Sequence, residues 1–427
     1  MHKMKTFNHK WSEIEEKIGG ELGAQVVAEL KNLYTLFDRK MITWQAELYE
    51  PAIGGFYFSN SARDNEPFLP DCESTIATLG FSVETGMTGG RDVVEAFPEW
   101  LRRKIANFAY TLQDEDGYFY HPQWGKEIGA LRKSRDYGTC IRLLRWGGVE
   151  PKYPLPTYLK KDETYDISKA PERFRSVENF KAYLNSLDFD TGAYASASLI
   201  SSSFGEVKTY SEMLGVDLFA MIFEILDSKQ RPDNGFWDPR VTVDGTNGVH
   251  KISKIYNWSG HKIPYVDKAI ESTLAVILDD HVATAGVEIY NPWSVLGSLI
   301  ENKRVCWGAD EEAIKPIINK VWSLAPKAIR KTYEKVLPLK ANGDGGIGYG
   351  NGHKGQYTAY GSPVAQPGAE ESNINVSACG SSSLVSNIYY GLDIQELMMP
   401  MFGEEDFKVY MDIIERKERE WQASQAK

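Results

Sequence analysis

The residues from Gln113 to Gly125 form the stretch with the greatest capacity for chemistry in this chain of 427 residues. They read QDEDGYFYHPQWG, which combines acids, a histidine, a glutamine and several aromatic rings. The imidazole of His121 can move protons near neutral pH, and the flat faces of Tyr120 and Trp124 can stack on a pyranose ring. We predict a catalytic or binding loop here. The alternative is a rigid turn in which His121 bonds to the backbone and Trp124 fills a gap.

Three further groups of polar residues could complete such a site. The sequence SRDYGTC contains Arg135 and Asp136, a guanidinium and a carboxylate that can hold hydroxyl or carboxylate groups. His250 and Lys251 open a helix after a long loop, and the alternative for them is a capping histidine and a surface lysine. The segment QPGAEESNINVSA brings two glutamates and two asparagines to the start of a helix of small residues.

The segment FLPDCEST allows two interpretations. Asp71 fits a helix N-cap, and Asp71 with Glu73 could also be the paired carboxylates of a glycosidase. The catalytic residues predicted from all these patterns are His121, Tyr120, Arg135, Asp136, Lys251 and Glu371. The predicted substrate-binding residues are Tyr57, Asp71, Glu73, Tyr118, Gln123, Trp124, Trp237, His250, Asn373 and Asn375. No HExxH, GxSxG or phosphate-loop pattern is present, so we expect no metal and no cofactor.

The elements that must position these residues are predicted to be helices joined by a repeated turn. Apolar residues recur at helical spacing in segments such as 93–112 and 313–337. A glycine turn followed by aromatic residues appears as GGFYFS, DGYFYHPQW, NGFWDP and DGGIGYG, with a weaker copy in DTGAYASAS. This repetition predicts stacked helical hairpins. Polar residues in or just after the turns should then line one side of the stack.

Three of the turns, LQDEDGYF, KQRPDNGFW and ANGDGGIGY, resemble the Gln-x-x-Asp-Gly-aromatic repeats of squalene cyclases and protein prenyltransferase β subunits. The resemblance covers most of the chain and implies the α/α toroid of that superfamily, a barrel of about six helical hairpins. The chain lacks the superfamily's Asp-x-Asp-Asp acid, its Asp-Asp-x-x-Asp diphosphate motif and a zinc set near Cys379. We therefore expect an all-α fold, with the toroid as a single domain over residues 41–402. An N-terminal helical segment over residues 1–40 should pack on the barrel, and a charged helix should occupy residues 403–427.

Composition and charge narrow the partners. The net charge of −11 argues against nucleic acid and against an anionic membrane surface. No apolar run is long enough for a transmembrane helix, and the first residues lack the apolar stretch of a signal peptide, so we expect a cytoplasmic protein. The four cysteines are far apart in the sequence, which suits reduced thiols. The oligomeric state stays open, and the expected partner is a small molecule or an oligosaccharide.

Four functions fit these patterns. The first is a lyase that cleaves an oligosaccharide beside a uronic acid by β-elimination. In it Arg135, Lys251 and Asn375 would neutralise the carboxylate while His121 or Tyr120 moves protons. The second is a glycoside hydrolase that uses carboxylates such as Asp71, Glu73, Asp136 and Glu371. A terpenoid cyclase-like or prenyl-binding enzyme and a non-catalytic binding toroid are the remaining alternatives. The mixture of His, Tyr, Arg and Lys in the turns favours the lyase.

Overall fold

The computed structural model describes residues 7–155, 167–340, 343–351 and 354–426, and it is mostly helical. The described strands form two antiparallel pairs, β1 (Tyr49–Glu50) with β2 (Gly55–Phe56) and β3 (Thr358–Ala359) with β4 (Ser362–Pro363). The all-α prediction is confirmed. In the described part of the chain, no helix is both long enough and apolar enough to cross a membrane.

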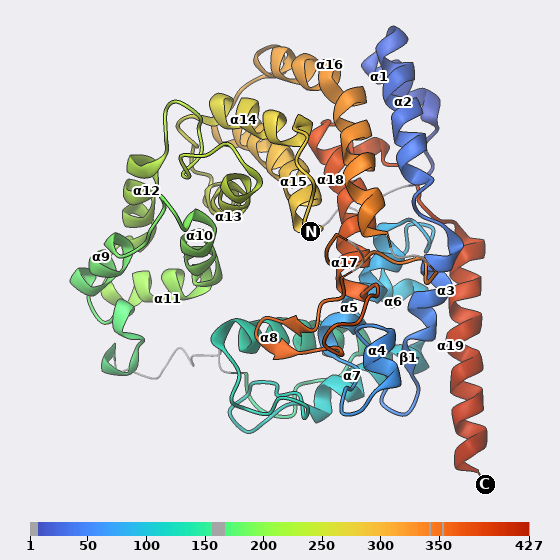
Figure 1. Ribbon diagram of the computed structural model, residues 1–427. Coiled ribbons are helices and arrows are strands. Elements are labelled where there is room, and N and C mark those ends of the chain that lie inside the picture. The colour runs from blue at the N-terminus through green and yellow to red at the C-terminus, as the bar shows by residue number, and fades with distance from the viewer. Residues whose placement is uncertain (1–6, 156–166, 341–342, 352–353, 427) are drawn as a thin grey trace.

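Six helical elements carry much of the apolar core. They are α5 (Cys72–Glu84), α8 (Ala130–Gly147), α10 (Ala193–Ser202), α13 (Val243–Ser259), α15 (Val287–Glu301), and the pair α17 (Ile374–Ala378) and α18 (Leu384–Gly391). Contacts run from α8 to α5 and from α5 to α17, and also from α10 through α13 and α15 to α18 (Figure 1). One π-helical turn, η5 (Cys379–Ser383), joins α17 to α18, and such turns occur frequently at functional sites.

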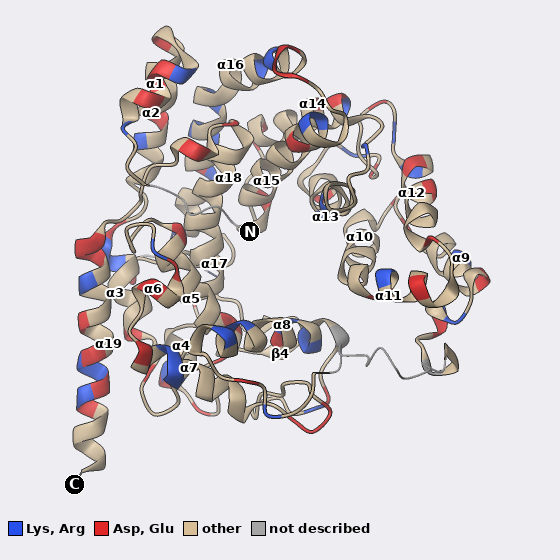
Figure 2. Ribbon diagram, turned by 180° about the vertical axis from the view of Figure 1, so that it is seen from behind, with Lys and Arg blue, Asp and Glu red and all other residues tan. Residues whose placement is uncertain are grey.

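Other helices cover this set from outside. The helix α7 (Glu99–Thr111) packs on α8, α14 (Val266–Leu278) on α15, and α16 (Glu311–Val336) on α14 and α2 (Gly20–Tyr34). A charged helix, α19 (Glu404–Gln425), runs along α3 (Arg39–Glu47), and its ribbon contains both basic and acidic residues along much of its length (Figure 2). The remaining described helices are α1 (Trp11–Ile18), α4 (Asn60–Asp64), α6 (Val93–Ala96), α9 (Val177–Asn185), α11 (Phe204–Leu214) and α12 (Leu218–Lys229), with the single turns η1 (Ile167–Lys169), η2 (Glu172–Phe174), η3 (Asn302–Cys306), η4 (Leu337–Leu339) and η6 (Gln395–Leu397).

Two of the repeated glycine turns, those at Gly117 and Gly235, share a construction that explains their sequence. Gly117 and Gly235 both have positive φ, and a Cβ at Gly235 would lie 2.2 Å from the backbone nitrogen of Ala269. In both of these turns a buried glutamine amide closes the loop. Gln113 donates to the Gly117 carbonyl at 3.2 Å, and Gln230 donates to the Gly235 carbonyl at 2.8 Å.

The other end of each glutamine amide fixes the segment that follows the turn. The Gln113 carbonyl oxygen accepts from the backbone N–H of Tyr153 at 3.0 Å, and the Gln230 oxygen accepts from that of Tyr265 at 3.1 Å. The aromatic residues after the glycines, Phe119 and Phe236, are fully buried. The repeated turn is therefore a structural joint, because its polar groups are bonded within the turn and to the next segment.

Candidate functional site

A buried charged cluster lies where α5 and α8 begin. The Arg132 guanidinium, 1% exposed, bridges Glu73 at 3.3 Å and Asp136 at 2.7 Å. Asp71 is the N-cap of α5 and accepts from the Ser74 backbone N–H at 2.8 Å, as predicted, and its charge also acts on Arg132. Burial raises the pKa of Asp136 to about 6, although Arg132 opposes this rise. The carboxylates thus stay buried because they are grouped around one central cation, Arg132.

Arg135 connects this cluster with a more open region. Its guanidinium forms an ion pair with Glu73, yet 46% of its side chain is exposed. The guanidinium lies over the ring of Tyr360, 4.5 Å from the ring centre. Tyr360 occupies the turn between β3 and β4 with a φ of 51°, and Gly361 follows with a φ of 83°. The backbone of a tyrosine is strained in a turn position that asparagine or glycine usually occupies, and such strain is often found at functional sites.

The helix α13 brings a second group of bases to the same region. Burial lowers the pKa of Lys251, and the charge of Arg135 on α8 lowers it further. Lys254 lies one turn beyond, and its pKa is lowered to about 8 by burial and then by Lys251. The Lys254 Nζ is 3.0 Å from His250 Nε2, and burial with the charge of Lys254 holds the pKa of His250 well below its ordinary value.

These two lysines differ from the buried lysines elsewhere in the protein. Lys104 lies 2.7 Å from Glu418, and Lys335 lies 2.9 Å from Asp279. By contrast, no acid in the described residues forms an ion pair with Lys251 or Lys254. A partly buried ammonium without a carboxylate is costly, which accounts for the lowered pKa of both lysines.

Aromatic rings and a thiol complete the lining. Tyr290 on α15 and Cys379 in η5 influence one another's pKa, and Tyr360 and Tyr194 on α10 also act on Tyr290. Burial and then the charge of Glu84 raise the pKa of Cys379 to about 11, so the thiol is protonated at neutral pH. The region we call the inner site is defined by Arg135, Lys251, Lys254, Tyr194, Tyr290, Tyr360 and Cys379.

The sequence predicted part of this inner site. Arg135 and Lys251 were predicted, and the charge of Arg135 lowers the pKa of Lys251, while Glu73 and Asp136 join the adjoining buried cluster. The residues that sequence reasoning missed are Arg132, Lys254, Tyr194, Tyr290, Tyr360 and Cys379. A signal existed for two of them, because Arg132 and Lys254 each lie three residues from a predicted residue on the same helix, where side chains share one face.

His121 occupies a closed position beside the buried cluster. Its Nε2 lies 2.8 Å from the Pro70 carbonyl, its Nδ1 accepts from the Gln123 backbone N–H at 3.3 Å, and its ring stacks on Trp124 at 4.2 Å. Burial lowers the pKa of His121. Trp124 also contacts Arg132, whose guanidinium lies 4.5 Å from the centre of a Trp124 ring. Both imidazole nitrogens are therefore occupied, which matches the rigid-turn alternative and leaves no free nitrogen for proton transfer.

We expect His121→Ala to lower the free energy of unfolding by about 1–3 kcal/mol, because the Pro70 carbonyl loses its buried partner. The pKa of His121 is lower in the folded state than in the unfolded state. The contribution of the neutral imidazole to the free energy of unfolding is therefore present above the ordinary histidine pKa and is lost as the pH falls through the lowered pKa. Urea unfolding at several pH values measures both effects. His9→Ala, which removes a pair with Glu13 on α1, is the control, and an equal loss in both variants would contradict the prediction.

The other polar and aromatic side chains of residues 113–125 have partners outside the inner site. The Tyr120 hydroxyl donates to Asp116 at 2.6 Å, and burial with this carboxylate raises the pKa of Tyr120 to about 12. The Tyr118 ring lies 3.8 Å from the Lys133 ammonium. Gln123 joins two loops, accepting from the Leu69 backbone N–H and donating to the Pro363 carbonyl. These contacts give the three side chains structural roles.

The remaining predicted residues are also held by neighbours. The two oxygens of Glu371 accept from Ser59 at 2.6 Å and from the Ser61 backbone N–H at 2.7 Å, so the structure does not join this carboxylate to Arg135 and Lys251. Asn373 caps α17. The buried Trp237 donates to the Leu226 carbonyl at 2.7 Å, the Tyr57 hydroxyl donates to Glu50 at 3.3 Å, and the Asn375 oxygen lies 3.8 Å from the Cys379 sulfur. Of these, Asn375 borders the inner site.

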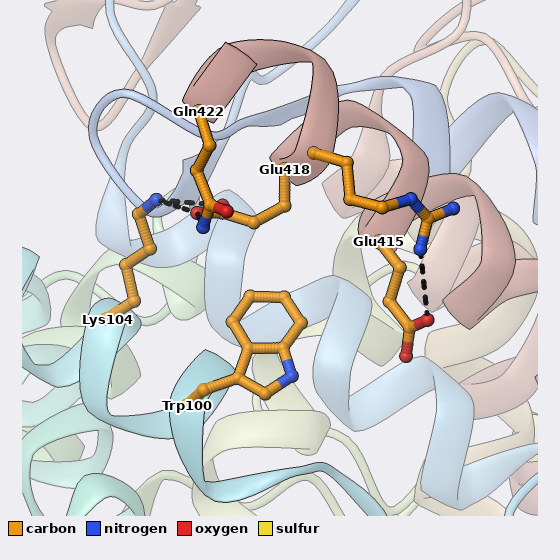
Figure 3. Close-up of a pocket in the computed structure, with 6 residues that line it drawn as sticks. Trp100, Lys104, Glu415, Glu418 and Gln422 are labelled. Carbon is orange, nitrogen blue, oxygen red and sulfur yellow. Dashed lines mark hydrogen bonds and ion pairs between the residues drawn. The ribbon is translucent and has the colours of Figure 1, made fainter. Parts of the chain in front are cut away.

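Two hollows of the described structure lie elsewhere. One, of about 530 Å³, separates α7 from α19 on the outer face (Figure 3). The other, of about 180 Å³, lies at residues 279–283 beside the last turns of α16. Neither contains a residue that the sequence analysis selected.

No group of three His, Cys, Asp or Glu side chains within the described residues is placed to hold a metal ion. Comparisons of this chain with family models, with curated proteins and with solved structures find no match.

Proposed function

We propose that this chain is an enzyme that cleaves an oligosaccharide beside a uronic acid by β-elimination at the inner site. One observation carries the proposal: the charge of Arg135 on α8 lowers the pKa of Lys251 on α13, and no described acid pairs with Lys251. A uronate carboxylate between the two cations would supply the missing negative charge. When that carboxylate is neutralised, the pKa of the adjacent C–H bond falls. Removal of this proton is the difficult step of the elimination.

Two groups have the protonation states that elimination requires. Burial and the charge of Glu73 raise the pKa of Tyr360 to about 12, so its phenol is protonated and can donate to the leaving oxygen. The lowered pKa of Lys254, about 8, leaves part of its amine neutral near physiological pH, so it can accept the proton from carbon. In this proposal Tyr360 and Lys254 take the roles first expected of Tyr120 and His121, whose polar atoms are bonded elsewhere.

We also propose that the helices close an α/α toroid whose inner helices are α5, α8, α10, α13, α15 and the α17–α18 pair. Support comes from the contacts that run from α8 through α5 to α17 and from α10 through α13 and α15 to α18. In Figure 1 these helices follow one another around a common centre. The repeated turn gives further support, because the same glutamine–glycine joint recurs at Gln113 and Gln230. A toroid would place the inner site at its axis.

Hydrolysis by a carboxylate pair is the second candidate. It is favoured by the pKa of Asp136, raised to about 6 as a general acid requires. Against it, Asp136 is buried against Arg132. A terpenoid cyclase is less compatible with the lining, because Arg135 and Lys251 would repel a carbocation.

Incubation with a panel of uronic-acid oligosaccharides tests the proposal. Elimination creates a conjugated double bond that absorbs ultraviolet light, and we expect that absorbance to rise. New reducing ends without the absorbance would indicate hydrolysis and overturn the elimination. The absence of any cleavage across the panel would favour a binding protein.

Tyr360→Phe should reduce kcat about 10²-fold in this assay, because it removes only the hydroxyl that protonates the leaving oxygen. The ring beneath Arg135 stays, so the fold and the substrate KM should change little. Tyr357→Phe is a matched control directly before β3, with 51% of the residue exposed, and should keep full activity. Equal rates for the two variants would remove Tyr360 from the mechanism.

A further inference from the structure

The hollow between α7 and α19 has the composition of a ligand site. It encloses about 530 Å³ and is lined by Trp100 and Lys104 of α7 and by Glu415, Glu418, Arg419 and Gln422 of α19. Figure 3 shows the Trp100 indole pointing toward the side chains of α19. This volume lies within the range that holds a small molecule or one to two sugar rings.

The polar side of the hollow is fixed before any ligand arrives. The Glu418 carboxylate accepts from Lys104 Nζ at 2.7 Å, from the Tyr49 hydroxyl at 3.2 Å and from the Gln422 amide at 3.0 Å. Lys104 Nζ also lies 4.0 Å from the centre of a Trp421 ring, which limits its movement. A ligand that binds here meets side chains already ordered, so it loses less binding energy to ordering them.

The Trp100 indole differs from the other exposed tryptophans. Trp258 packs edge-on against Phe204, and Trp307 has two lysine ammonium groups over its ring. Among the described residues, no aromatic ring or cation covers Trp100, which is 38% exposed. An uncovered indole flanked by hydrogen-bonding groups is suited to the apolar face of a pyranose.

The charges of the lining balance. Lys104 and Arg419 offset Glu418 and Glu415, and Arg419 Nη1 lies 3.6 Å from Glu415 Oε2. The hollow therefore does not favour an anion, in contrast to the inner site. We propose that it binds a neutral pyranose unit of an oligosaccharide, stacked on Trp100 and held through its hydroxyls by Gln422 and Glu415. The choice of a saccharide ligand rests on the proposed function, whereas the hollow and its neutrality do not.

Binding of neutral hexasaccharides (of glucose, xylose and mannose) to the whole chain tests this proposal by saturation-transfer NMR and calorimetry. We expect at least one to bind the wild type and Trp100→Ala to weaken it about tenfold or more. Gln422→Ala should weaken it less. Trp258→Ala, which removes a tryptophan 60% exposed elsewhere, should bind as the wild type does, and so should Lys251→Met.

Three outcomes would overturn the inference. They are no binding by the wild type, equal binding by Trp100→Ala, and a Trp100→Ala variant whose only change is its association state in sedimentation, which would indicate a second copy as the occupant. Circular dichroism of Trp100→Ala shows whether the variant is folded, and Gln422→Ala gives a second test with a smaller change. Loss of elimination activity has no bearing on these outcomes, because Lys251→Met addresses the inner site and Trp100→Ala the hollow.

Discussion

Arg132→Met should lower the free energy of unfolding by about 3–5 kcal/mol, the largest stability loss expected from a single change in this chain. Arg132 is the cation that contacts both Glu73 and Asp136, and all three side chains are buried. Methionine fills part of the volume but leaves the Asp136 carboxylate without its partner in a poorly hydrated place. Urea unfolding of wild type and variant measures the loss.

The pH dependence of this loss identifies its cause. The pKa of Asp136 is raised in the folded protein to about 6, so the folded state binds this proton more tightly than the unfolded state does. Its contribution to stability is therefore present below the ordinary pKa of an aspartate and lost as the pH rises through about 6. Arg132 lowers the pKa of Asp136, so in the variant that pKa should be raised above its ordinary value by a larger amount. The variant should then approach the wild type as the pH falls and Asp136 becomes neutral.

A control separates the buried ion pair from loss of charge in general. Arg103 on α7 is 66% exposed and pairs with Glu99 at 2.8 Å, so Arg103→Met should cost about 0–0.5 kcal/mol. Adding Asp136→Asn to Arg132→Met should restore part of the stability, because the unpaired charge disappears. A loss in Arg132→Met that is small, or that does not change with pH, would show that the cluster is hydrated and contributes little.

Much of the helical architecture could be predicted because its signals are local. Helical spacing of apolar residues places α7 and α16, and the glycines at 117 and 235 mark turns that only a residue without a side chain accommodates well. The pairing of helices that lie far apart in the sequence has no such local signal. It depends on contacts such as those between α17 and α5, whose residues are about 300 positions apart in the sequence.

The inner site was predicted in part for a related reason. Arg135 and Lys251 follow repeated turns, and the rule that polar residues after the turns face one region selected them. The same rule selected His121 and Glu371, whose atoms are taken up by Pro70 and by Ser59 and Ser61. The sequence cannot distinguish these cases, because whether a side chain is free depends on a partner 51 residues away for His121 and 312 away for Glu371. Tyr360 was missed because the feature that singles it out, the Arg135 guanidinium above its ring, arises only in the folded protein.

Lys251→Met should reduce kcat/KM for elimination about 10³-fold, the largest loss of activity expected from one substitution. In the proposed reaction the ammonium would offset the charge that develops on the uronate when the C–H bond breaks, and methionine keeps the chain length without that charge. Since no described acid pairs with Lys251, its removal strands no buried carboxylate, and the free energy of unfolding should stay level or rise. Steady-state kinetics and urea unfolding on the same preparation check both statements. Lys303→Met, which removes a lysine paired with Asp267 outside the inner site, is the matched control.

The pH profile of this variant decides whether Lys251 acts on the reaction or only on the structure. If Lys254 is the base, kcat/KM of the wild type should rise with pH until Lys254 is neutral, near its pKa of about 8. The charge of Lys251 is one cause of that lowered pKa, so Lys251→Met should raise the pKa of Lys254 and move the rising limb to higher pH. A merely structural lysine would lower the rate at every pH and leave the limb in place. An unmoved limb would thus remove Lys254 as the base, whereas a moved limb with an unchanged plateau would show that Lys251 tunes the base and does not hold the carboxylate.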